Sequence, residues 1–273
     1  MSTPPPVALS FSRLSLYSAC PLRYRYLEVD GTPEPDVPPD WRHARARLGP
    51  AAIASPFDRS FGVAVHAGLA GWQRGVDGGA SPTAAGLFAA VRSAAARSRL
   101  DPTRVEAALA HLEEGLGSYA TGPWPRRATL FLEHRVTHRL TAPDGFAVEL
   151  HLRVDRVARF RRGVAIIDFK TVSPHAFELR VDRWQLHTYA LAAPSLLGVA
   201  SDRVHLGLID LRQGTEIEVG ASTSELAAAA EELLGDARRI AAADFAVTGH
   251  PDRPCWSCGF RVQCPSSLVP APG

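Results

Sequence analysis

The stretch Val164-Ala-Ile-Ile-Asp168-Phe-Lys170 has the pattern of a buried β-strand that ends on charged residues. Asp168 and Lys170 are two positions apart, so both side chains leave the same face of an extended strand. The segment Leu152-Arg-Val-Asp155-Arg ends in a similar way. Aspartate is disfavoured in strands and costly to bury alone, so these carboxylates indicate either salt bridges to neighbouring basic residues or a chemical site. A carboxylate beside an amine favours a metal-assisted hydrolytic site.

The spacing between Asp155 and Asp168 is about enough for a strand, a tight turn and a return strand. Such a hairpin brings both carboxylates to one edge, where a hard cation such as Mg2+ or Mn2+ finds oxygen ligands. Lys170 would then lie beside the metal and orient an attacking water. Gln185 and Tyr189 are four positions apart on a predicted helix and therefore share a face. Gln185 can position a water or a phosphate there, whereas Tyr189 can equally be an ordinary packing residue.

Apolar periodicity around these segments predicts the remaining elements. Strands are expected at 128–140, 146–160 and 164–171, with turns at Asp144-Gly145 and Arg162-Gly163, and this order predicts a meander of three antiparallel strands. Further strands are expected at 204–210 and 216–219. Helices are expected from Ser12 to Leu27 with Ser10 or Ser12 as cap, around Gly62 to Leu69, and at 82–98, 102–119, 181–191 and 224–243. A loop is expected at 31–56. The order predicts an α/β fold with a mixed central sheet flanked by helices.

Composition limits the class of protein. The 273 residues, of which 46% are hydrophobic, suit one large domain or two small ones. A formal net charge of +2 gives no global basic field. Neither a secretion signal nor a long apolar span is evident, so we expect a cytoplasmic protein without membrane partners. Disulfides are not expected there, which makes the four cysteines more interesting as ligands.

A family resemblance follows from these residues. Asp155, Asp168-Phe-Lys170 and Gln185-Leu-His-Thr-Tyr189 occur in the order and spacing of the PD-(D/E)XK nuclease superfamily, and the chain resembles its RecB-like branch. A lone helical histidine is more often structural, but His66 matches the helix-borne metal ligand of that branch. The resemblance implies a restriction-endonuclease-like core. It also implies Mg2+ or Mn2+ on His66, Asp155, Asp168 and the Phe169 carbonyl, with Lys170 and Gln185 as further catalytic residues.

The cysteines carry a second resemblance. Cys20 is followed far downstream by Cys255-x2-Cys258-x5-Cys264, so one ligand is N-terminal and three are C-terminal. This pattern is similar to the iron-sulfur nucleases of the same branch, which include the AddB-type nuclease domain and the CRISPR-adaptation exonucleases. The resemblance implies that Cys20, Cys255, Cys258 and Cys264 hold a 4Fe-4S cluster that closes the tail on the first helix. Thiolates also suit zinc, which stays open as the other occupant.

The resemblance predicts one domain and one departure from the family. The nuclease domain is expected at 7–265, with a helical part at 57–122 and a catalytic sheet core at 128–243. An iron-sulfur element would combine Cys20 with 255–264, leaving flexible ends at 1–6 and 266–273. Many relatives carry glycine three residues before the first aspartate, where this chain has Leu152.

Nucleic-acid contacts are predicted near the N-terminus. Arg13, Arg23, Tyr24 and Arg25 cluster on the first predicted helix, with Arg42, Arg45 and Arg47 in the following loop, although a solvated face explains them equally well. Glu133 matches an acidic position seen in relatives, with a structural role as the alternative. We therefore expect a metal-dependent deoxyribonuclease, an exonuclease of DNA repair, recombination or CRISPR adaptation. Its partners would be single-stranded or end-bearing DNA and a helicase or CRISPR-adaptation protein. The alternative is a non-cutting, cluster-stabilised module that binds DNA or a partner.

Overall fold

The structure is a computed structural model that describes residues 6–35, 59–171, 176–247, 255 and 258–267. Most of the predicted loop at 31–56 and part of the C-terminal tail lie outside these residues. The chain forms two compact units. The first unit comprises residues 1–55, 137–151 and 230–273, and the second comprises 56–136 and 152–229.

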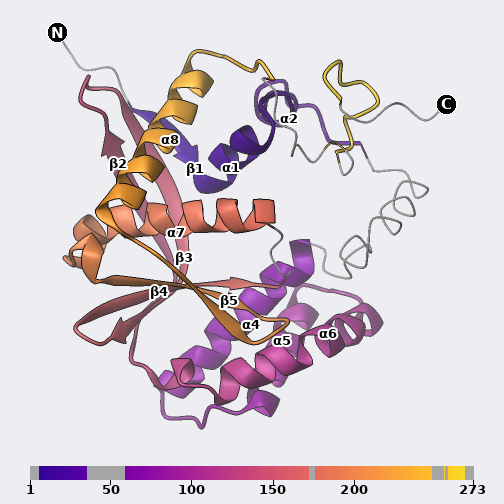
Figure 1. Ribbon diagram of the computed structural model, residues 1–273. Coiled ribbons are helices and arrows are strands. Elements are labelled where there is room, and N and C mark those ends of the chain that lie inside the picture. The colour runs from indigo at the N-terminus through magenta and orange to yellow at the C-terminus, as the bar shows by residue number, and fades with distance from the viewer. Residues whose placement is uncertain (1–5, 36–58, 172–175, 248–254, 256–257, 268–273) are drawn as a thin grey trace. The chain divides into compact units, whose positions relative to one another are not determined.

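A mixed β-sheet forms the centre of the fold (Figure 1). Its strands are β1 (Val7–Ser10), β2 (Thr129–Thr141), β3 (Ala147–Phe160), β4 (Gly163–Lys170), β5 (Val204–Asp210) and β6 (Thr215–Val219). The order is β1-β3-β4-β5-β6, and β2 also pairs with β3. The β1/β3 and β4/β5 pairs are parallel, whereas β3/β4 and β5/β6 are antiparallel. The predicted α/β class with a mixed sheet is confirmed.

The predicted strand meander is present as β2, β3 and β4. A short turn joins β2 to β3, closed by the Ala142 N–H, which donates to the Phe146 carbonyl at 2.8 Å. The β3/β4 register runs from Phe160↔Gly163 to Arg156↔Ile167. Six consecutive residues of β4, from Val164 to Phe169, are buried. That continuous burial matches a strand covered on both faces, as parallel pairing with β5 requires.

Helices cover both faces of β4 and β5 (Figure 1). The helices α4 (Arg59–Asp77), α5 (Ala84–Arg97) and α6 (Pro102–Thr121) share one hydrophobic core with alternate residues of these strands. Ala165, Ile167 and Phe169 belong to that core, so the residues between them face the other side. The other side is covered by α7 (Ala176–Leu197), which packs on β4 and β5. The alternation therefore directs Asp168 and Lys170 toward α7.

Local capping signals fix the helix ends. The Thr83 side chain accepts from the Gly86 N–H at the start of α5, and the Asp101 carboxylate accepts from the Arg104 N–H ahead of α6. At α8 (Thr223–Ala241), Ser222 and Glu225 each accept from the other's backbone N–H, which is a capping box. These helices confirm the predictions at 82–98, 102–119 and 224–243.

The prediction of one helix from Ser12 to Leu27 is wrong. The structure has α1 (Phe11–Ala19), α2 (Pro21–Tyr24) and the π-helix η1 (Arg25–Val29), interrupted at Cys20. Pro21 lacks the N–H that a continuous helix needs, and Cys20 is extended with φ −163°. Ser10 is confirmed as the cap, because its hydroxyl accepts from the Arg13 N–H at 3.2 Å. The preceding strand β1 was not predicted.

Candidate active site

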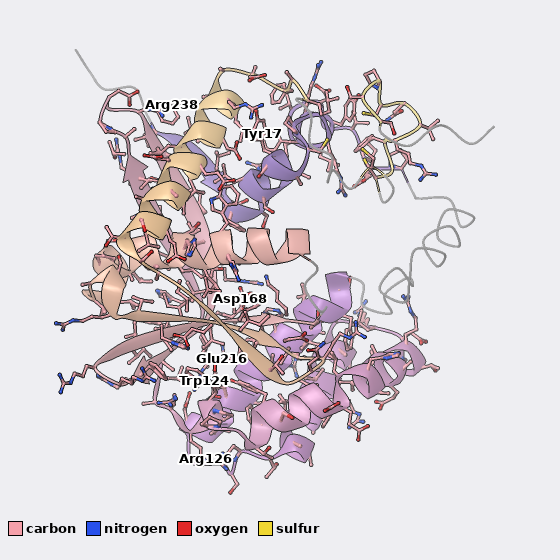
Figure 2. The ribbon with its side chains drawn as sticks, in the orientation of Figure 1. Tyr17, Trp124, Arg126, Asp168, Glu216 and Arg238 are labelled. Atoms are coloured by element: carbon pink, nitrogen blue, oxygen red, sulfur yellow. The ribbon has the colours of Figure 1, made fainter. Side chains whose placement is uncertain are left out.

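The C-terminal end of β4 presents a lysine and an aspartate that contact each other. Asp168, labelled in Figure 2, is 3% exposed. The Lys170 ammonium lies 2.9 Å from its Oδ2. Lys170 Nζ also donates to Gln185 Oε1 on α7 at 3.2 Å. The amine is therefore held between a carboxylate and an amide, with its position set by two different elements.

Asp155 lies on the neighbouring strand, just beyond the last residue of the β3/β4 register at Arg156. Its Oδ2 accepts from the Phe169 backbone N–H at 2.9 Å, so the carboxylate takes the place of a ladder carbonyl. Asp155 is 5% exposed. The hairpin thus places both predicted aspartates at the same end of the β3/β4 pair.

His66 and Glu133 complete a group that can hold a metal ion. His66 Nδ1 on α4 lies 3.2 Å from Asp155 Oδ1 and 3.7 Å from Glu133 Oε1 on β2. One ligand atom from each of His66, Glu133 and Asp155 lies within 4.8 Å of the others. An imidazole nitrogen with carboxylate oxygens suits Mg2+ or Mn2+. The Phe169 ring contacts His66 edge-on at a centroid distance of 6.3 Å, while its carbonyl as a ligand stays a prediction.

The backbone at Glu133 is strained. Its φ of +49° lies in the left-handed region, which is rare for a residue other than glycine within a strand. The carboxylate there faces His66 and also pairs with the Arg153 guanidinium, with Nε 3.2 Å from Oε2. Strained residues of this kind cluster at functional sites. The sequence singles out Glu133 without assigning it a ligand role, because the alternating strand pattern contains no sign of the distorted backbone.

Burial and neighbouring charges shift the pKa values of three groups in the site. Burial lowers the pKa of His66, but the adjacent Asp155 carboxylate more than compensates and raises it to about 10. Burial also raises the pKa of Asp155, yet the charged His66 holds it below its usual value. At Asp168 burial prevails over the Lys170 charge and raises the pKa to about 6. In this arrangement the imidazole of His66 lies beside the carboxylates of Asp155 and Glu133.

Two buried atoms of the site also fit a metal ligand role. His66 Nδ1 and Asp168 Oδ2 are inaccessible to solvent and have no hydrogen bond of good geometry to any described residue, although charged groups lie close to both. Buried polar atoms in this condition are costly unless another partner binds them. A divalent cation bound by the group of His66, Glu133 and Asp155 would satisfy His66 Nδ1, whereas Asp168 is not part of that 4.8 Å group among the described residues.

Gln185 and Tyr189 form a fixed pair on α7. Gln185 Nε2 donates to the Tyr189 hydroxyl at 2.6 Å, and that hydroxyl donates to the Arg153 carbonyl at 2.7 Å. Tyr189 is 1% exposed, and burial raises its pKa well above the ordinary value. In the structure the Tyr189 hydroxyl fixes the amide that holds Lys170, and its contact with substrate stays a prediction.

The predicted DNA contacts near the N-terminus already have protein partners. Arg13 pairs with Glu28 at 2.6 Å and Arg23 with Glu34 at 2.7 Å. The Tyr24 ring is 5% exposed and stacks on Phe245, and its contact with a base stays a prediction. Arg42, Arg45 and Arg47 lie outside the described residues.

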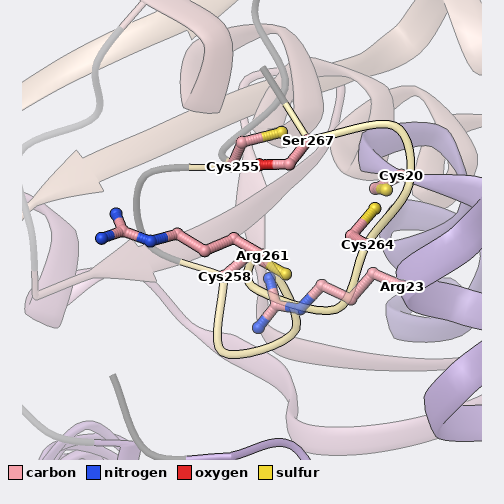
Figure 3. Close-up of a pocket in the computed structure, with 7 residues that line it drawn as sticks. All are labelled: Cys20, Arg23, Cys255, Cys258, Arg261, Cys264 and Ser267. Carbon is pink, nitrogen blue, oxygen red and sulfur yellow. The ribbon is translucent and has the colours of Figure 1, made fainter. Parts of the chain in front are cut away.

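The four cysteines line one pocket of the first unit (Figure 3). The other lining residues are Arg23, Arg261 and Ser267. The tail thus closes on the α1–α2 junction at Cys20, as predicted. Burial raises the pKa of the Cys258 thiol. Among the described residues, no three of the cysteine sulfurs approach one another as closely as the 4.8 Å group formed at His66.

Glu34 joins the two chain segments that form this pocket. One carboxylate oxygen accepts from Arg23 at 2.7 Å, and the other accepts from the Gly259 N–H at 3.0 Å. A Cβ at Gly259 would overlap the Pro35 carbonyl oxygen, so only glycine permits this approach. The Tyr26 and Phe260 rings add a contact at a centroid distance of 4.9 Å. These contacts between protein groups help to hold the cysteine tail against the N-terminal segment.

The structure combines a mixed sheet covered by helices with an Asp-x-Lys strand end, beside which lie a histidine and two acidic residues. This arrangement is consistent with a restriction-endonuclease-like core. The family model of the PD-(D/E)XK nuclease superfamily matches residues 8–265. The chain belongs to this superfamily, which places it among nuclease-type hydrolases.

Other comparisons add little to this assignment. A solved structure titled "Crystal structure of SSO0001" is similar with 15% identity and a TM-score of 0.43, over 98% of this chain and 91% of that one. No curated protein matches the chain. None of the helices in the described ranges combines the length and apolar character that a membrane crossing needs.

Proposed function

We propose that this chain is a Mg2+- or Mn2+-dependent deoxyribonuclease that hydrolyses phosphodiester bonds. The observation that carries the proposal is the meeting of His66, Glu133 and Asp155 ligand atoms within 4.8 Å in a member of a nuclease superfamily. The adjacent Asp168 and Lys170 pair supplies the remaining groups that such a reaction needs.

The residues of the site have distinct roles in this proposal. His66, Asp155 and Asp168 hold the cation, with Glu133 and the Phe169 carbonyl as further ligands. When bound, the cation polarises the phosphate and lowers the pKa of a ligated water. Lys170, fixed by Asp168 and Gln185, orients the attacking water and offsets negative charge on the phosphoryl oxygens. Attack on phosphorus expels the 3′ oxygen.

The substrate and pathway are further parts of the proposal. We infer single-stranded or end-bearing DNA as substrate and exonucleolytic action, by analogy to the RecB-like branch. A helicase or a CRISPR-adaptation protein is the partner that this analogy suggests. Cleavage of oligonucleotides labelled at the 5′ or the 3′ end measures the direction of degradation. A covalently closed DNA substrate distinguishes exonuclease from endonuclease action, because an exonuclease needs an end.

For the cysteine pocket we propose a 4Fe-4S cluster on Cys20, Cys255, Cys258 and Cys264. The four cysteines line one pocket, and thiolates of this kind suit either a cluster or a zinc ion. The Arg23 and Arg261 side chains lining the pocket suit the net negative charge of a thiolate-ligated cluster. Anaerobically purified protein should be brown with stoichiometric iron. A colourless protein with stoichiometric zinc would refute the assignment.

The nuclease proposal is tested by Asp168→Asn and Lys170→Ala, assayed on labelled DNA with Mg2+ or Mn2+. Each substitution should reduce cleavage by at least about a hundredfold, because each removes a group that acts on the reacting phosphate. A matched control is Asp210→Asn, since Asp210 is also buried and pairs with Lys170 in the β4/β5 register. Its carboxylate accepts from the Arg212 and Gln213 N–H groups, so the control should keep its cleavage activity.

Undiminished cleavage in both site variants would remove this site from consideration. Cation-dependent DNA binding without turnover on any DNA substrate would instead favour the non-cutting binding module.

A further inference from the structure

Arg153 reaches the cation site from β3 through Glu133. Its Nε lies 3.2 Å from Glu133 Oε2, while the other carboxylate oxygen lies 3.7 Å from His66 Nδ1. A single carboxylate thus contacts two basic side chains, the imidazole of His66 and the guanidinium of Arg153. The left-handed φ of Glu133 belongs to the backbone conformation from which its side chain makes both contacts.

The Arg153 side chain is half exposed, while its backbone is tied to the fold. The side chain is 50% exposed although it pairs with Glu133, so it lies at the protein surface. Its carbonyl, in contrast, accepts from the buried Tyr189 hydroxyl at 2.7 Å. A guanidinium on a fixed backbone at the edge of a metal site can exchange one oxyanion for another without rearrangement of the strand.

We propose that Arg153 contacts a phosphate of the substrate DNA and that cation binding releases it from Glu133 to do so. This inference rests on the proposed nuclease function. A divalent cation within reach of Glu133 competes for the carboxylate and repels the guanidinium, so the Glu133–Arg153 pair weakens as the metal enters. A phosphodiester beside the metal then offers planar, two-oxygen pairing to the released arginine.

The exchange couples the two binding events. The cation removes the internal partner of Arg153, so DNA binds more tightly when the cation is present. By thermodynamic linkage, DNA must also tighten cation binding by the same factor. Arg153 itself opposes cation binding in the absence of DNA, because it shares the Glu133 carboxylate.

The test measures binding of a short fluorescein-labelled single-stranded oligodeoxynucleotide by anisotropy, in Ca2+ and in EDTA at matched ionic strength. Gel analysis after each titration verifies that the oligonucleotide is intact. Wild-type protein should bind the oligonucleotide more tightly in Ca2+ than in EDTA. In Arg153→Gln the ratio of these two affinities should be about tenfold smaller than in wild type. Calorimetry with Ca2+ alone should show that Arg153→Gln binds the cation as tightly as wild type or more tightly.

Two further variants make the result specific. Arg159→Gln removes the same charge from an exposed position farther along β3 and should retain the Ca2+-dependent gain. Arg153→Lys keeps the charge without the planar fork and should retain part of the gain. Circular dichroism and thermal melting confirm that each variant is folded.

An unchanged Ca2+-dependent gain in Arg153→Gln would overturn the inference, and so would weaker cation binding by this variant. If wild-type protein cleaves DNA with Mg2+ while either result holds, only the inference fails. If wild-type protein neither cleaves DNA nor binds it more tightly in Ca2+, the proposed function fails with it.

Discussion

The charged residues at the end of β4 are held in position by side chains from more than one element. Lys170 is held by Asp168 and by Gln185, and Gln185 is held by the Tyr189 hydroxyl. Tyr189 in turn donates to the Arg153 carbonyl on β3. The position of the ammonium thus depends on a chain of contacts that runs through the buried Tyr189 to the backbone of β3.

Substitution Tyr189→Phe should therefore weaken catalysis without removing a ligand. The change leaves Gln185 Nε2 and the Arg153 carbonyl without their buried partner, which should cost about 1–3 kcal/mol of unfolding free energy. We expect kcat to fall about tenfold because Lys170 loses orientation, while the Mn2+ affinity measured by calorimetry stays unchanged. A variant with wild-type kcat would show that the Gln185 contact does not position Lys170.

The residues of the site differ in how well the sequence alone identifies them. Asp155 and Asp168 were predictable because the hairpin length between them fixes which strand ends meet. His66 needed the family resemblance, since nothing in a helical pattern distinguishes a ligand from a packed histidine. Glu133 and Tyr24 depended on tertiary structure: a left-handed backbone brings Glu133 to His66, and stacking on Phe245 buries Tyr24.

At the scale of elements, α6 packs closely against the end of β5. A Cβ at Gly115 would overlap the carbonyl oxygen of Leu211, directly after β5, so the helix backbone lies against the chain that leaves the strand. Gly115 is thus a packing requirement in a helix where glycine is otherwise unfavourable.

Substitution Gly115→Ala should lower the free energy of unfolding by about 2–4 kcal/mol, because the backbone of Leu211 must move. The matched control is Gly117→Ala in the same helix, where an added Cβ meets no atom within 4 Å among the described residues. That control should stabilise by up to about 1 kcal/mol through helix propensity. Urea unfolding measures both, and equal stability of the two variants would contradict the packing argument.

Glu216 on β6 links two other elements through its carboxylate. One oxygen accepts from the Trp124 indole at 2.9 Å and the other lies 2.6 Å from His205 Nε2 (Figure 2). Burial raises the pKa of Glu216, but the contacts to His205 and Trp124 prevail and lower it below its ordinary value of 4.5. A lowered folded-state pKa means that ionisation stabilises the fold above about pH 4.5, and that this stability is lost as the pH falls through the folded-state pKa.

Substitution Glu216→Gln should accordingly lower Tm by about 2–4 °C at pH 7. The difference from wild type should shrink as the pH falls toward 3, since the wild-type carboxylate becomes protonated there. Glu218→Gln is the control: its side chain is 75% exposed and 3.4 Å from His205, so little change is expected. A Tm difference that stays constant with pH would assign the effect to packing instead of charge.

Elements with long periodic patterns were predicted well, and short or interrupted ones were not. The strands expected at 146–160 and 164–171 match β3 and β4 because alternation and turn residues agree over many positions. Strand β1 has four residues, too few for a pattern, and forms only because β3 provides a parallel partner at Val148 to His151. The hydrophobic periodicity continues across Cys20-Pro21 and so predicted one helix, although the proline interrupts the helix there.

At the scale of the whole molecule, the two metal-binding hypotheses fall in different compact units. The residues of the cation site all belong to the unit formed by 56–136 and 152–229. The four cysteines belong to the unit formed by 1–55, 137–151 and 230–273. Glu34 and Gly259 hold the cysteine tail by contacts within that same unit. Neither set of ligands takes a residue from the other unit, so loss of one metal should leave the ligands of the other intact.

The double substitution Cys255→Ser and Cys258→Ser tests this independence. If the proposed 4Fe-4S cluster is present, the variant should lose the iron and the visible absorbance, because two of the four thiolates are gone. Its Mn2+ affinity, measured by calorimetry, should stay within about twofold of wild type, as expected for sites that share no partner residues. Conversely, Asp168→Asn should lose cation affinity and keep its full iron content. A loss of Mn2+ binding in the folded cysteine variant would show that the cluster stabilises the nuclease site across the unit boundary, and would make the two sites one cooperative system.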